Sequence, residues 1–111
     1  MIEQLILEFL KEKLDVPVYL ERPDLLDENF VFFEKTGSSR ENFLESSTFA
    51  FQSYGRSLYE AAELNSKLKL AMYQLIDLSE VSKVKLNSDY NFTDIETKKP
   101  RYQAVFDIWH Y

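Results

Sequence analysis

The sequence predicts an α+β domain in which an antiparallel sheet of about four long strands carries two helices on one face. Two segments space their apolar residues as helices do. The other stretches either alternate polar with apolar residues or are rich in β-branched and aromatic residues. The resulting order is αβββαββ, and its short connections favour antiparallel neighbours in the sheet.

The chain begins with a predicted amphipathic helix over residues 2–14, because one side of that stretch is apolar at helical spacing. Residues 16–20 predict a brief extended segment, and Pro17 confines it to a strand start or a sheet edge. Pro23 and the acidic residues 24–29 predict a turn. A strand is expected over 30–36, ending at Gly37, and a polar loop over 37–42.

The second half predicts a strand, a long helix and two further strands. Residues 46–54 alternate as a strand and stop at Gly55. Ser57 followed by Glu60 is typical of a capping box, and a broad apolar stripe over 58–76 predicts the helix that it opens. Val84 and Leu86 alternate with polar residues in a strand that has one wet face. A loop over 91–99 and a last strand over 102–111 complete the chain.

Composition limits the size and class of the protein. Its 111 residues suit a single domain, 1–111, and with 45% hydrophobic and 15% aromatic residues a packed core is well supplied. The net charge of -6 argues against specific DNA binding or docking on anionic lipid. Two distant glycines provide no phosphate loop, and zero cysteines exclude thiolate metal sites and disulfides. We therefore expect no cofactor, no metal and no membrane or small-molecule partner.

Catalytic motifs are also missing from the sequence. The start of the chain lacks a signal-peptide pattern, which favours the cytoplasm. The single histidine, His110, is expected to be a partly exposed residue near the end of the chain. Glu60 and Glu63 have Arg56 and Lys67 at i,i+4 positions and predict a solvated, ion-paired helix face rather than an acid/base pair. The interpretation is that the protein is not an enzyme.

The predicted sheet has one face that two helices cannot cover. Val105, Trp109 and Tyr111 lie opposite the core side of the last strand, on a face that would ordinarily be more polar. Half-exposed aromatic residues, or a first helix that wraps around the sheet, explain this pattern as well as a subunit interface does.

Two polar loops, over 36–42 and 91–99, are predicted to carry recognition, as loops on a rigid sheet often do. The candidate interface residues that they and the start of the last strand contribute are Thr36, Ser38, Arg40, Asn91, Asp94 and Arg101. Arg40 and Arg101 are the candidates for charged pairs across the interface.

Three stretches resemble a known family: 16–24 (VPVYLERPD), 30–65 (beginning FVFFEKTGSSRENF) and 81–111 (beginning VSKVKLNSDYNF). Their most distinctive pieces are Glu34-Lys35-Thr36-Gly37, Ala50-Phe51-Gln52-Ser53-Tyr54, and residues 87–92 leading to 101–106. The chain resembles the small head-to-tail joining, or tail-terminator-like, proteins of long-tailed bacteriophages and prophages of Gram-positive hosts.

This resemblance implies a structural role. Such proteins are α+β subunits that assemble as rings, commonly hexameric, between the tail tube and the head connector. The two polar loops would then contact neighbouring rings, and shortening either one should spare folding but abolish head-to-tail joining. The implied partners are copies of the chain itself, connector proteins and tail-tube proteins, and the implied location is the virion, assembled in the bacterial cytoplasm. DNA would pass through the ring without specific binding, and an acidic lumen would suit that passage.

Two other classes of function stay open. A small acidic adaptor or inhibitor would bind a basic host protein and remain monomeric or dimeric. An enzyme with an unrecognised site would need a deep pocket lined by convergent polar groups. Light scattering over a range of concentrations separates a ring from an adaptor.

Overall fold

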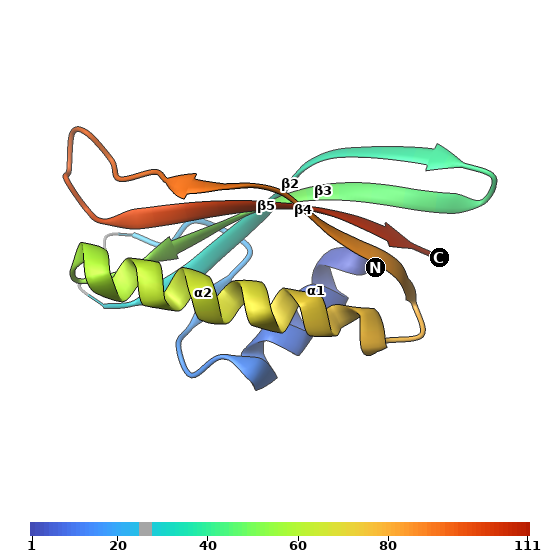
Figure 1. Cartoon of the computed structure of the whole chain (residues 1–111), viewed down its shortest axis with the longest axis horizontal. Coiled ribbons are helices and arrows are strands. Elements are labelled where there is room, and N and C mark those ends of the chain that lie inside the picture. The colour runs from blue at the N-terminus through green and yellow to red at the C-terminus, as the bar shows by residue number, and fades with distance from the viewer. Residues whose placement is uncertain (25–27) are drawn as a thin grey trace.

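The computed structural model describes residues 1–24 and 28–111 (Figure 1). The predicted turn over 24–29 therefore lies partly outside the described residues. The elements in chain order are α1 (Ile2–Lys13), β1 (Val18–Tyr19), β2 (Phe30–Glu41), β3 (Leu44–Tyr54), α2 (Leu58–Gln74), the 3-10 turn η1 (Leu75–Asp77), β4 (Val81–Asn91) and β5 (Arg101–His110).

The sheet has the strand order β1-β2-β3-β5-β4 and is antiparallel except for the parallel pair β1 and β2. Both helices lie on the same side of it, so the α+β class with two helices on one face is confirmed (Figure 1). Four of its strands have ten or more residues, and the segment expected at a sheet edge supplies the short fifth strand, β1.

The core lies between the sheet and the helices and is dominated by aromatic rings. Phe51 is fully buried, and its ring centroid lies 5.1 Å from that of Phe33, 6.2 Å from Phe49 and 5.9 Å from Phe106. The helices cover these rings with apolar side chains that were expected on their inner faces. These side chains are Ile2, Ile6 and Leu10 of α1 and Ala61, Leu64, Leu68, Ala71 and Met72 of α2.

The start of α2 is stabilised as the sequence predicts. The Oγ of Ser57 accepts a hydrogen bond from the backbone N–H of Glu60 at 3.1 Å, which satisfies one of the free amides of the first turn. Further along the helix, Asn65 is buried and its Nδ2 donates to Asp89 of β4 at 2.7 Å. Lys69 pairs with the same carboxylate. These contacts fasten α2 to the β4 side of the sheet.

The expected polar loop over 37–42 is wrong, because this stretch belongs to β2. Strand β2 continues to Glu41 and pairs with β3 as far as Leu44, with a register shift between Lys35 and Gly37. Only Asn42 and Phe43 form the turn, at φ angles of 51° and 68°, the left-handed values that a two-residue hairpin turn requires. Gly37 does not have a positive φ and does not end the strand.

The projecting end of this hairpin is called the arm here and comprises residues 37–46. Its turn end extends beyond the ends of both helices (Figure 1). Polar residues lie on both of its faces because both faces of the β2 segment meet solvent, and backbone hydrogen bonds to β3 hold one edge of that segment. The polar composition of this strand is typical of a loop, and for this reason the sequence predicted a loop here.

Other boundaries differ slightly from the prediction. Strand β4 runs from Val81 to Asn91, so Asn91 ends a strand rather than opening the loop. Strand β5 ends at His110, which leaves Tyr111 beyond the sheet. The long helix ends at Gln74 and is followed by η1. The predicted strand end at Gly55 is confirmed, since β3 ends at Tyr54.

Candidate functional site

The sheet face opposite the helices, called the helix-free face here, carries a ladder of polar side chains across neighbouring strands. The Nε2 of Gln52 on β3 donates to Gln103 on β5 at 3.1 Å, and Gln103 in turn donates to the hydroxyl of Tyr90 on β4. Further towards the arm, Thr48 and Asn87 both donate to the carboxylate of Asp107, at 2.7 and 3.1 Å. The ladder joins β3, β5 and β4 side by side.

Two apolar residues predicted for this face, Val105 and Trp109, do lie on it and are half-buried. The ring of Trp109 has the Nζ of Lys83 4.9 Å from its centroid, a cation–π contact from the neighbouring strand. The first helix does not wrap around to cover them, because α1 lies on the same side as α2 (Figure 1). Tyr111 is 77% exposed and follows the strand, its backbone N–H bonded to the carbonyl of Glu80.

At the far end of the helix-free face lies a small aromatic cluster, whose buried members are Phe30, Phe32 and Tyr54. The rings of Phe30 and Tyr54 stack with centroids 4.5 Å apart. The Nη1 of Arg101 donates to the hydroxyl of Tyr54 at 2.9 Å, and the hydroxyl donates to Gln52. Arg101, a predicted interface residue, is therefore engaged within the subunit.

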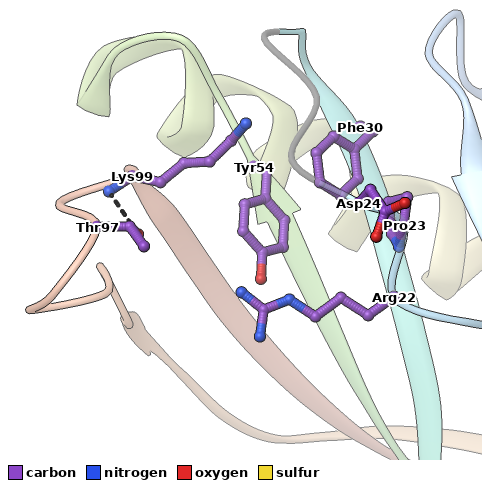
Figure 2. A pocket seen from close by; sticks show the side chains of 7 residues that line it. All are labelled: Arg22, Pro23, Asp24, Phe30, Tyr54, Thr97 and Lys99. Carbon is purple, nitrogen blue, oxygen red and sulfur yellow. Dashed lines mark hydrogen bonds between the residues drawn. The ribbon is translucent and has the colours of Figure 1, made fainter.

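A pocket of about 290 Å³ opens beside this cluster (Figure 2). Arg22 approaches the hydroxyl end of Tyr54, while the side chain of Lys99 lies near the opposite end of the Tyr54 ring (Figure 2). The Nζ of Lys99 lies 5.5 Å from the centre of the Phe30 ring. The remaining lining residues are Pro23, Asp24 and Thr97. Of the two cationic side chains, only Lys99 lies over the aromatic rings of Phe30 and Tyr54, and the lining also includes the acidic Asp24, so the pocket has charges of both signs.

The predicted recognition loop between β4 and β5 is held by its own side chains. The Oδ1 of Asn91 accepts from both the backbone and the hydroxyl of Thr93, at 3.0 and 2.7 Å. Asp94 accepts from the backbone N–H of Glu96 at 2.9 Å, and this hydrogen bond lowers the pKa of the Asp94 carboxyl. Asn91 and Asp94 therefore shape the loop, and Ile95, 91% exposed, is the apolar side chain that it presents.

Three predicted interface residues lie in β2, with Thr36 just before the arm and Ser38 and Arg40 within it. Thr36 sits at the register shift and donates to the carbonyl of Thr48 at 3.3 Å. Ser38 and Arg40 follow on the side of the sheet that carries the helices, paired with Ser47 and Glu45. All three are exposed, as is Phe43 at the tip with 90% of its surface accessible.

The expectation that His110 is partly exposed is wrong. The imidazole is only 5% exposed, and its Nε2 is hydrogen bonded to the Oγ of Ser47 at 2.8 Å. It is buried because β5 lies between β3 and β4, which places the last strand inside the sheet rather than at its edge. Burial lowers the pKa of His110 below its ordinary value of 6.5. The Lys35 charge lowers it further, while the smaller effects of Glu45 and Glu3 raise it.

This buried histidine should make stability depend on pH. The folded state binds a proton less readily than the unfolded state, so stability should be full above pH 6.5 and fall as the pH drops towards the lowered folded pKa. Urea unfolding at a series of pH values should show a smaller loss for His110→Gln than for the wild type in that window. Equal losses for the two proteins would contradict this assignment.

Several residues of the site were missed by the sequence. Gln52, Gln103 and Tyr90 meet only because their strands are neighbours in the sheet. Phe43 was hidden in a polar stretch, although Asn42 before it is a common first residue of a two-residue turn. The predicted ion pair of Glu63 with Lys67 is present at 3.8 Å, whereas Glu60 bonds to Ser57 and Asn29.

No protein-family model matches the sequence, and no curated protein matches it either. Within residues 1–24 and 28–111, no three His, Cys, Asp or Glu side chains gather closely enough to hold a metal ion. Over the same residues, no helix is long and apolar enough to cross a membrane.

Proposed function

We propose that this protein is a non-catalytic structural subunit that joins the head connector to the tail of a long-tailed bacteriophage or prophage. Copies of the chain form a ring, commonly a hexamer in the proteins that it resembles, which contacts connector and tail-tube proteins. The ring is a component of the virion and assembles in the host cytoplasm. It takes no cofactor, membrane or small-molecule substrate.

One observation supports this proposal above the others: a single small subunit has both a projecting arm and a sheet face without helices (Figure 1). A closed ring made by rotation needs two different surfaces on each subunit, since each copy meets its neighbours through unlike patches. The arm supplies one exposed surface, with Arg40 and Phe43 near its tip. The sheet face and its edge supply others.

The net charge of -6 supports a passive role towards DNA. Acidic residues that line a ring repel phosphates, so a duplex can pass without being held. A strongly basic lumen in the assembled ring would contradict this part of the proposal.

The joining role is tested by mixing the purified protein with isolated tail tubes and imaging them in negative stain. We expect a cap at one end of each tube. A variant that lacks residues 40–45, with Ser39 joined to Ser46 through an Asn-Gly turn, shortens the arm while keeping a two-residue hairpin. It should keep the far-UV circular dichroism of the wild type and lose capping.

The matched control is Lys11→Glu, which changes an exposed charge on α1, away from the arm. It should cap tails as well as the wild type. Normal capping by the shortened variant would show that the arm is not the joining element. A wild-type protein that stays monomeric and caps no tails would favour the adaptor.

A further inference from the structure

Two edges of the sheet are left without a partner strand in the described part of the chain. Strand β4 pairs only with β5. Strand β2 has β1 beside it only at Val31 and Phe32, so from Phe33 to Glu41 its outer edge is open. Residues 34–41 are all exposed. Open edges present unpaired N–H and C=O groups, to which another strand can add.

The directions of the strands permit these two edges to pair between copies. Strand β2 is antiparallel to β3, β3 to β5 and β5 to β4, so β2 and β4 also run in opposite directions. A second copy placed beside the first in the same orientation brings its β2 antiparallel to β4. Each added copy leaves its own β4 open, so the contact repeats until a ring closes.

The charges on the two edges are complementary on the helix-free face. Lys83 and Lys85 of β4 lie on this face. Across the sheet, Lys83 is in register with Ser39 of β2, and Lys85 is in register with Gly37. Glu34 and Glu41 lie on the same face of β2, one before Gly37 and the other after Ser39. Two copies that lie side by side, with no shift along the strands, therefore place the two lysines of one copy between the two glutamates of the next. Gly37 has no side chain and nothing within 4 Å of its Cβ position, which leaves room for Lys85.

The same charges oppose the wrong pairings. Two β4 edges would bring lysines together, and two β2 edges would bring glutamates together, and like charges directly across a strand pair are destabilising. Register shifts interrupt both edges, near residue 36 in β2 and near residues 82 and 87 in β4. Such irregularities limit indiscriminate pairing of open edges. A head-to-tail contact is thus favoured over a symmetric dimer.

We propose that copies of this chain join head to tail by antiparallel pairing of β4, over residues 81–86, with residues 35–41 of β2 in the next copy. This inference deepens the proposed ring function and rests on it. It assigns the contact between ring neighbours to the sheet edges and leaves the helix-free face to the neighbouring rings.

The absence of cysteine permits a clean crosslinking test. The double variant Ser39→Cys with Lys83→Cys, treated with a short bis-maleimide at high concentration and again with tail tubes present, should give a ladder of dimers, trimers and larger species. Each single variant should stop at the dimer. A double variant that crosslinks no further than the control pair Ser39→Cys with Lys11→Cys, under both conditions, would overturn the inference.

Charge reversal tests the specificity of the contact. A second cysteine pair, Ser39→Cys with Ser82→Cys, leaves both lysines intact. Adding Lys85→Glu to this pair should reduce the yield of crosslinked species roughly fivefold, the effect of a like charge across a strand pair. Further change of Glu34→Lys, the glutamate nearer to position 85 in this register, should restore it, and Lys11→Glu should leave it unchanged. A Lys85→Glu variant with a full ladder would contradict the charge argument.

Tail capping separates this inference from the proposed function. A ladder without capping would leave the edge contact standing and refute the joining role. Capping of tail tubes without a crosslinking ladder would refute the edge contact and leave the joining role standing.

Discussion

The variant Gly55→Ala is expected to lose about 3 kcal/mol or more of its free energy of unfolding, the upper range for an added methyl group that cannot be accommodated. A Cβ at this position would lie 2.3 Å from the backbone N of Ala61 and 2.8 Å from the carbonyl oxygen of Ser57. These two atoms share the first hydrogen bond of α2, at 3.0 Å. Because they belong to the backbone, no side-chain rotation relieves the clash, and the first turn of α2 has to move.

Gly37→Ala is the matched control for this substitution. Its Cβ would meet nothing within 4 Å, so its stability should stay within about 0.5 kcal/mol of the wild type. Urea unfolding of both variants measures the difference. Equal stabilities would show that the close approach of Gly55 to α2 is not needed for the fold.

The variant Phe51→Ala should lose about 3–5 kcal/mol, the usual effect of removing a buried aromatic ring. Phe51 is fully buried and contacts three other rings at once, those of Phe33, Phe49 and Phe106. Much of the stability of a small domain, about 5–15 kcal/mol in total, would be lost. Phe51→Leu refills most of the cavity and should lose less than about 1.5 kcal/mol.

Phe43→Ala provides the control for this series, because the same side chain at the arm tip is 90% exposed. Its loss should stay within about 0.5 kcal/mol. Thermal and urea unfolding of the three variants tests the order of stabilities. A Phe43→Ala variant as unstable as Phe51→Ala would mean that the arm tip packs against the subunit in solution.

The arm illustrates where sequence patterns were insufficient. Residues 37–42 are rich in Ser, Arg and Glu, and a polar stretch after a glycine is typical of a loop. The stretch is a strand because β3 supplies cross-strand hydrogen bonds along one of its edges, whereas its side chains contact mostly water. Polarity reports how much a residue contacts solvent, and it does not report whether the backbone has a partner.

The candidate site was predictable in part. The alternation of β5 placed Val105 and Trp109 opposite the core, and both lie on the helix-free face. Asn91, Asp94 and Arg101 stay predicted interface residues, and each is also hydrogen bonded within its own subunit, which the sequence did not indicate. Residues of one strand can be assigned to faces from spacing alone, but hydrogen bonds between strands depend on which strands are neighbours.

The sequence by itself determined the α+β class, both helices, the four long strands and the end of β3 at Gly55, because spacing, capping and turn residues act over a few neighbouring positions. Only the tertiary structure decided that β5 enters between β3 and β4. That long-range pairing buries His110 against Ser47 and leaves β4 at the edge. It also determines which charges lie along the open edges, and so the contact proposed between copies.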